Sequence, residues 1–216
     1  MSTPQEIDFL ALSTYQRYKL MASLIIPRPI ALVTTLGASG VANAAPFSMF
    51  NMVGEDPPLV MISINRLKDG RLKDTAANIL ASGEFVVHMS DEPMAQKMHA
   101  CGEAFPSEVS ELAAVGLTPV PSHGVRPPRI AEAPVAFECV LAEQLVTESR
   151  YVFFGEIRWM VARDGLIDTE AWRVNLRDYA PVARFGASFY IRTGDRFAIA
   201  DRDEALGARA TAIDRL

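Results

Sequence analysis

The sequence predicts a mainly β protein, a β-barrel with a few inserted helices, from three observations. Short apolar runs rich in Val, Ile, Phe and Thr recur at close spacing. Turn signals separate these runs, and helical signals are few. The half of the chain after residue 130 lacks the helices that the alternative, a parallel βαβ sheet, would need between most strands. Closely spaced strands with few helices are typical of a closed or nearly closed barrel.

The first half of the chain predicts a hairpin and a buried strand. Residues 1–24 form an N-terminal arm with a short helix. Residues 30–36 are apolar and threonine-rich, Gly37–Gly40 is a turn sequence, and residues 41–46 form the return strand. Residues 59–64 are a continuous apolar run of the length of a buried strand.

Helix signals follow, each with a start or stop residue. Asp74 or Thr75 is a suitable N-cap for a helix that ends near Ala81, with Gly83 after it. Further elements are predicted from the same rules: a strand over 84–89, a helix opened by Asp91-Glu92-Pro93, a short helix over 107–115 closed by Gly116, and a proline-rich extended connection over 117–134.

Two long strands are predicted after this connection. The second covers 151–161 and alternates between an apolar and a wetter face. Asp164-Gly165 predicts a hairpin turn that pairs this strand with residues 166–167, and residues 168–189 are irregular. No repeat or linker divides the chain, so we expect a single domain over 1–216, with a C-terminal tail at about 198–216.

Charge and cysteine usage exclude several classes of partner. The 216 residues carry a net charge of −5 without any Lys/Arg-rich run, which argues against nucleic acid and anionic membrane surfaces. The apolar stretch 20–36 is broken by two prolines and should not span a membrane. We expect no signal peptide and two reduced thiols, Cys101 and Cys139, in a cytoplasmic protein. The histidines and cysteines show no metal-binding spacing, so no metal is expected.

The stretch GRLKDTAANI, residues 70–79, permits two interpretations. A helix N-terminus offers free N–H groups to a phosphate, and Arg71, Lys73 and Thr75 could add a forked contact, a point charge and a hydroxyl. Asp and Thr also begin many helices purely as caps, and basic residues near loops are usually solvated. These ten residues leave both interpretations open.

The stretch NAAPFSMFN, residues 43–51, resembles the lining of a cofactor pocket in composition. Asn43, Ser48 and Asn51 can bond polar edges, and Phe47 and Phe50 can form apolar walls. A strand-end bulge whose polar side chains bond the local backbone explains the stretch equally well. For Phe50, a place in the core is the more common role.

Common catalytic signatures are absent from the sequence. It contains neither G-x-G-x-x-G after a strand nor Walker A, G-x-S-x-G or H-E-x-x-H. With three histidines and two cysteines, candidates for side-chain catalysis are few, and we expect no catalytic residue. If the protein is an enzyme, a bound cofactor carries the chemistry.

Several segments together resemble the flavin reductase-like proteins with the FMN-binding split-barrel fold. They are PRPIALVTTLGASGVANAAPFSMFNMVGEDPPLVMISI, GRLKDTAANILASGEFVVHM, RPPRIAEAPVAFECVL and RFGASFYIRTGDRF. The resemblance covers about residues 15–197, and the order of N-x-A-P-F-S-x-F-N, D-P-P and K-D-T is specific. It implies a homodimer of six-stranded antiparallel split barrels with FMN at the interface.

The resemblance also implies cofactor-binding residues. At the phosphate end these are Lys73, Asp74 and Thr75, with Arg28 and Arg71 as additional partners. Around the flavin ring and ribityl chain they are Thr34, Thr35, Ala45, Pro46, Phe47, Ser48, Asn51 and Ser63, and Asn43 joins them as a candidate from the composition of residues 43–51. A C-terminal motif adds Arg184, Gly186 and Tyr190, with Ala187 where many relatives carry a second glycine.

The implied function is an FMN-dependent oxidoreductase of the NAD(P)H:flavin oxidoreductase type. NADH or NADPH would be the electron donor, and the small-molecule acceptor is open. An FMN electron carrier reduced by a partner protein is the alternative, and the sequence contains nothing that separates the two. A barrel module without redox function is a third hypothesis, and it predicts no binding of FMN.

Overall fold

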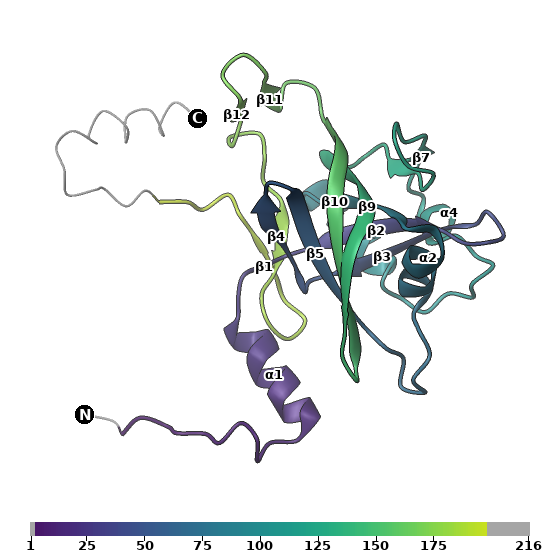
Figure 1. Ribbon diagram of the computed structural model, residues 1–216. Helices are drawn as coiled ribbons and strands as arrows, with labels where there is room; N and C mark the ends of the chain where they lie inside the picture. The colour runs from purple at the N-terminus through teal and green to yellow at the C-terminus, as the bar shows by residue number, and fades with distance from the viewer. Residues whose placement is uncertain (1–2, 198–216) are drawn as a thin grey trace.

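One antiparallel sheet of seven strands forms the centre of the computed structural model, which describes residues 3–197 (Figure 1). The strand order is β3-β2-β6-β9-β10-β5-β4. In chain order these strands are β2 (Ala31–Leu36), β3 (Ala42–Phe47), β4 (Phe50–Glu55), β5 (Pro58–Asn65), β6 (Glu84–Met89), β9 (Val135–Val146) and β10 (Arg150–Ala162). The mainly β prediction is confirmed, and the parallel alternative is wrong.

The two ends of this sheet meet at one short connection. The edge strands β3 and β4 are consecutive in the chain and are joined by Ser48 and Met49. The Ser63 N–H of β5 donates to the Met49 carbonyl at 2.8 Å. The sheet therefore curls toward closure at the NAAPFSMFN stretch. The resemblance implied six strands, and the seventh arises because Phe50–Glu55 pairs with β5.

Large apolar side chains fill the interior of this curled sheet. Phe85 and Phe153 have no exposed surface, and Ile62 packs in the same cluster. Gly155 makes this packing possible, because an added Cβ there would lie 2.3 Å from Cζ of Phe85. The hairpin predicted at Gly37–Gly40 is confirmed, with Leu36 opposite Ala42.

The first helix precedes the strands, and the others are inserted between strands along the chain. The helices are α1 (Thr14–Leu24), α2 (Asp74–Ser82), the 3₁₀ turn η1 (Glu92–Met94), α3 (Ala95–Ala100) and α4 (Glu111–Val115). Of these, α2, α3 and α4 each contact β3. Gly83 and Gly116 end their helices with left-handed backbone, as expected. The predicted N-cap of α2 is wrong: Lys73 holds that position in extended backbone, and no side chain caps the helix.

The proline-rich connection over 117–134 is fixed by buried polar side chains. The Thr34 hydroxyl donates to the Pro128 carbonyl at 2.6 Å. His88 accepts from the Ile130 N–H at 3.0 Å, and Glu138 accepts from the backbone of His123 and Gly124. Two short strands lie in the connection, β7 (Pro119–Val120) and β8 (Arg129–Ile130).

The pairing predicted after Asp164-Gly165 is wrong. The end of β10, Trp159–Ala162, pairs with β9 on one edge, and residues 166–167 do not pair along its other edge. Instead β11 (Ile167–Asp168) pairs with β12 (Arg173–Val174). A third small sheet joins β1 (Arg28–Pro29), β13 (Val182–Arg184) and β14 (Tyr190–Arg192). The predicted tail at 198–216 lies outside the described residues.

Helix α1 stands away from the strands at the base of the molecule in Figure 1, and none of its residues is buried. Its start is well defined, because Ser13 and Gln16 form a capping box. Among the helices of residues 3–197, none is long and apolar enough to cross a membrane.

Candidate functional site

The N-terminus of α2 presents uncapped backbone N–H groups. Lys73 precedes the helix in extended backbone, and its side chain does not cap the helix. The first N–H groups of a helix have no partner within the helix, and they carry partial positive charge. Thr75 lies in this turn with its side chain buried. The helix start is therefore suited to an anion.

Two half-buried cations, Lys73 and Arg150, lie beside this helix start. Burial lowers the pKa of Lys73, and the charge of Arg150 lowers it further. Burial also lowers the pKa of Arg150, whose Nη1 makes only long contacts to the Ser63 carbonyl at 3.4 Å and its hydroxyl at 3.5 Å. Neither cation has an acidic partner within ion-pair distance among residues 3–197. Desolvated, unpaired like charges are costly, and a bound anion would relieve that cost.

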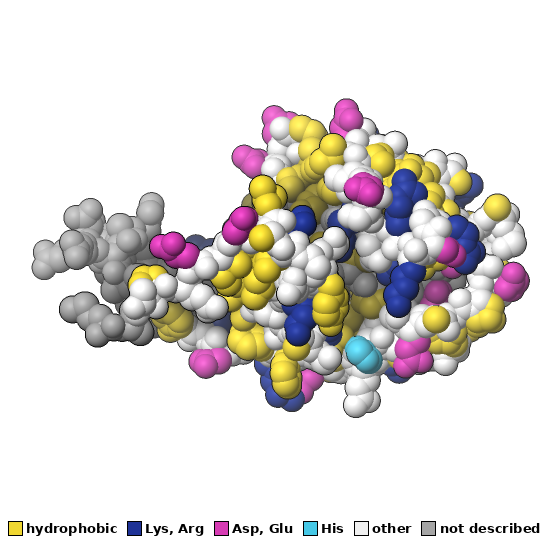
Figure 2. Space-filling view, turned by 90° about the horizontal axis from the view of Figure 1, so that it is seen from below, with side chains coloured by type: hydrophobic (Ala, Val, Ile, Leu, Met, Phe, Trp, Pro, Cys, Tyr) yellow, Lys and Arg dark blue, Asp and Glu magenta, His cyan; other side chains and the backbone are white. Residues whose placement is uncertain are grey.

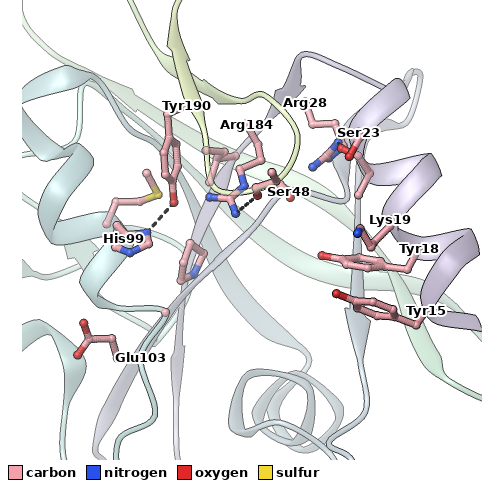
Figure 3. Close-up of a pocket in the computed structure, with 16 residues that line it drawn as sticks. Tyr15, Tyr18, Lys19, Ser23, Arg28, Ser48, His99, Glu103, Arg184 and Tyr190 are labelled. Atoms are coloured by element: carbon pink, nitrogen blue, oxygen red, sulfur yellow. Dashed lines mark hydrogen bonds between the residues drawn. The ribbon is translucent and has the colours of Figure 1, made fainter.

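A cavity of about 520 Å³ opens between α1 and the end of β3. Figure 3 shows Tyr15 and Tyr18 pointing from α1 across this space toward Ser48 and Arg184. The lining residues are Tyr15, Tyr18, Lys19, Ala22, Ser23, Arg28, Ile30, Pro46, Ser48, Met98, His99, Gly102, Glu103, Arg184, Ala187 and Tyr190. Basic side chains recur across the middle of the face in Figure 2, with apolar ones between them.

Arg28 and Arg184 lie directly opposite each other on the paired strands β1 and β13. Burial lowers the pKa of Arg28, and the charge of Arg184 lowers it further. Arg184 donates to the Ala187 carbonyl at 2.6 Å and lies 4.7 Å from the centroid of the Tyr190 ring. The Tyr190 hydroxyl is 2.8 Å from Nδ1 of His99 (Figure 3). Like charges facing each other across strands are unfavourable without an anion between them.

Tyr18 of α1 lies near one cation of each group, Arg28 and Arg150. The cations therefore form a series, Lys73, Arg150, Arg28 and Arg184, which runs from the α2 N-terminus to the cavity.

The structure brings together part of the predicted site. Lys73, Thr75 and Ser63 are grouped at the α2 start. The residues that line the cavity are Arg28, Pro46, Ser48, Arg184 and Tyr190. Ala45 is half-buried on the same strand as Pro46. Gly186 is buried with φ of +60°, and an added Cβ would lie 3.2 Å from Cα of Ser23 on α1.

Other predicted residues point elsewhere. The hydroxyls of Thr34 and Thr35 bond the Pro128 carbonyl and the Asn78 amide, and both side chains are fully buried. Six more lie outside the cavity lining, for different reasons. Phe47 and Phe50 belong to the core, Asn43 is buried against Thr75, Arg71 is exposed and paired with Asp69 at 2.7 Å, and Asp74 and Asn51 are exposed.

Sequence reasoning missed Arg150, Tyr18 and His99. Arg150 follows a hairpin turn and gains its place only because β10 pairs with β5, which sets it beside Ser63. Tyr18 and His99 lie on short helices whose sequences carry no site signal. The pairing register and the position of α1 cannot be read from local pattern.

Metal and thiol chemistry find no support in this region. Among residues 3–197, no group of three or more His, Cys, Asp or Glu side chains could hold a metal ion. Cys101 and Cys139 are free and buried. Burial raises the pKa of Cys101 to about 12 and also raises that of Cys139, so both stay protonated near neutral pH.

Comparisons with known proteins agree with this architecture. A solved structure with a split barrel domain, from Shewanella frigidimarina, superimposes with a TM-score of 0.75 over 90% of this chain and 96% of that one. Its sequence is 23% identical, so the likeness shows the fold alone. The fold is accordingly the split β-barrel of the FMN-binding class.

The family assignment follows from sequence. The family model described as flavin reductase like domain matches residues 21–179, and the chain therefore belongs to the flavin reductase-like family of oxidoreductases. The 2-nitrobenzoate 2-nitroreductase NbaA of Pseudomonas fluorescens is 41% identical, with a TM-score of 0.85 over 93% of this chain and 98% of that one. Nitrilotriacetate monooxygenase component B of Bacillus cereus is 32% identical, with a TM-score of 0.86 over 92% and 100%.

Proposed function

We propose that this protein binds FMN and works as an NAD(P)H-dependent oxidoreductase. The observation that carries the proposal is the pair of half-buried, unpaired cations Lys73 and Arg150 at an uncapped helix N-terminus. A phosphate monoester supplies the charge and acceptor oxygens that such a site requires. FMN differs from riboflavin by this group alone.

The residues fit the rest of the cofactor as well. Ala45 and Pro46 lie near the end of β3, and Ser48 follows it, where the two ends of the sheet meet. Their small side chains let a planar ring approach the backbone. Arg28, Arg184 and Tyr190 border the adjoining cavity. When bound, FMN would supply hydride transfer from NADH or NADPH to a small-molecule acceptor.

In this proposal the residues of the protein hold the cofactor in place and stabilise negative charge. Lys73, Arg150 and the α2 N–H groups anchor the phosphate. Arg28 and Arg184, which have no carboxylate partner among residues 3–197, favour negative charge in the cavity. The open cavity wall between α1 and His99 leaves space for a donor or an acceptor. Such placement requires no side-chain acid or base.

A homodimer with FMN at the interface is part of the proposal. Helix α1 buries none of its residues; its last residue, Leu24, and the following Ile25 are exposed by 73% and 59%. Met52 and Val53 are exposed on the edge strand β4. Monomeric proteins rarely leave such apolar segments uncovered, which supports a second copy as the covering surface. Light scattering after gel filtration measures the mass and tests this part.

The affinity for FMN against riboflavin tests the phosphate assignment. Lys73→Met and Arg150→Met should each weaken FMN binding about tenfold and leave riboflavin binding nearly unchanged, because each removes one charge-assisted contact. Lys68→Met and Arg158→Met are matched controls, since both side chains are exposed and Arg158 is paired with Glu156. Equal losses for both ligands would refute the assignment.

Visible absorbance under anaerobic conditions tests the redox part. Flavin bands that bleach with NADH or NADPH would identify the donor. Bands that persist with both donors would overturn the NAD(P)H-dependent activity and favour the electron carrier. Absence of FMN binding would overturn the whole proposal.

A further inference from the structure

A chain of three buried polar side chains lies behind the helix start. Glu111 from α4, Asn43 from β3 and Thr75 from α2 are exposed by 8%, 9% and 2%. Glu111 also accepts from the Ala44 N–H at 2.9 Å through Oε2. The chain thus reaches from a carboxyl group to the hydroxyl beside the proposed phosphate position.

The Asn43 amide fits this chain in either of two orientations. In one, Nδ2 donates to Thr75 Oγ1 at 3.0 Å, and Oδ1 faces Glu111. In the other, Nδ2 donates to Glu111 Oε1 at 3.2 Å, and Oδ1 accepts from the Thr75 hydroxyl at 3.0 Å. An ionised carboxylate accepts hydrogen bonds only, so the first orientation requires a proton on Glu111.

The two orientations leave Thr75 with different capacities. A hydroxyl has one proton to donate. When Asn43 donates to Thr75, this proton is free for an anion at the helix start. When Asn43 accepts from Thr75, the proton is already used inside the protein.

We propose that Glu111 and Asn43 are positioning residues that decide, through the protonation of Glu111, whether the Thr75 hydroxyl can donate to a bound phosphate. The inference rests on the proposed function, because it assumes that the FMN phosphate lies at the α2 start. A protonated Glu111 donates to Asn43, Asn43 donates to Thr75, and Thr75 donates to the phosphate. Ionisation of Glu111 reverses the first two bonds and uses the Thr75 proton inside the protein, so the phosphate loses one donor.

The surroundings of Glu111 favour its protonated form. Burial raises the pKa of Glu111, the Ala44 N–H opposes this, and the charge of Asp74 at the start of α2 adds to it. The Cys101 thiol, at the end of α3, is the other titratable group coupled to Glu111, and it stays protonated. The neighbouring strand β3 contributes Asn43 as its polar group.

The experiment measures Kd for FMN and for riboflavin by flavin fluorescence at about pH 6 and about pH 8. Wild type is compared with Glu111→Gln, Thr75→Val and the double variant. Gln is isosteric with Glu, and its amide can donate to Asn43 at every pH, which imitates the protonated acid. Riboflavin lacks the phosphate and therefore serves as the ligand control. The ionisation of the FMN phosphate itself is common to all four proteins.

Glu111→Gln should bind FMN about tenfold more tightly than wild type at about pH 8, with a smaller difference at about pH 6. Riboflavin affinity should not change. In the Thr75→Val background the gain should vanish, because no hydroxyl remains to be redirected. Thr75→Ser, which keeps the hydroxyl, should restore it.

A gain that persists in the Thr75→Val background would overturn the proposal, since it would show a direct effect of the Glu111 charge on the phosphate. Should Glu111→Gln fail to fold, wild type and Thr75→Val still decide the matter. The ratio of FMN to riboflavin affinity should depend on pH differently in the two proteins, and identical profiles would overturn the proposal. Wild type that binds both ligands equally would instead refute the phosphate site of the proposed function.

Discussion

His88 makes the fold sensitive to acid in a way that can be measured. Its ring is fully buried, Nδ1 lies 2.9 Å from the Leu32 carbonyl, and Nε2 accepts from the Ile130 N–H. This pairing requires the neutral ring with its proton on Nδ1. Burial lowers the pKa of His88 from 6.5 to about 4, the Leu32 carbonyl opposes this, and Arg129 adds to it.

The sign and size of the effect follow from proton linkage. Between pH 6.5 and about 4 the unfolded chain binds a proton that the folded chain excludes, so stability falls as pH falls. The stabilisation is fully present above 6.5 and is lost below about 4. The interval of 2.5 pKa units, from 6.5 to about 4, corresponds to about 3 kcal/mol.

Urea unfolding followed by circular dichroism, with wild type and His88→Gln at one protein concentration, isolates this contribution. Acidic groups titrate in both proteins and cancel in the difference between their free energies of unfolding. That difference should shrink by about 3 kcal/mol between about pH 7.5 and about pH 4. A difference that stays constant, or grows in acid, would refute the reasoning, and an NMR titration of the ring gives the pKa directly.

Two further substitutions test packing and backbone strain. Gly155→Ala should lower the free energy of unfolding by about 1–3 kcal/mol in urea, because the new Cβ would meet Phe85, whereas Gly194→Ala, with open space around it, should change it by less than about 0.5 kcal/mol. Ala187 has φ of +38°, in the left-handed region that disfavours a side chain. Ala187→Gly should therefore raise the melting temperature slightly, and a lower value would show that the methyl group contributes packing that outweighs the strain.

Much of the fold was predictable because its strands are defined by local pattern. The strand predicted over residues 84–89 has the bounds of β6. The strands predicted over 30–36 and 41–46 differ by one residue from the bounds of β2 and β3. The predictions are wrong where the position of a segment depends on the distant segment that it contacts. The turn sequence at Asp164-Gly165 is present, but Ile167 and Asp168 pair with Val174 and Arg173 rather than with β10. The sequence of the connection over 117–134 contains no local pattern that predicts its hydrogen bonds with the side chains of His88 and Glu138.

The candidate site was predictable to the extent that it lies on contiguous motifs. Lys73 and Thr75 were found because a helix start has a local signature. Arg150 was not found, because only the pairing of β10 with β5 places it near Ser63 and Lys73. Glu111 was not found either, because a glutamate at a helix start looks like an ordinary first-turn acid.

The sequence by itself determined the mainly β class, the family motifs and the absence of common catalytic signatures, since these depend on residue identity and short spacing. The tertiary structure decided which polar groups have partners. Within residues 3–197 it left Lys73, Arg150, Arg28 and Arg184 without carboxylate partners, and it buried Thr34, Thr35 and Asn43 against internal partners. The physical reason is that desolvation and pairing depend on neighbours brought together across the barrel, whose separation along the chain carries no local signal.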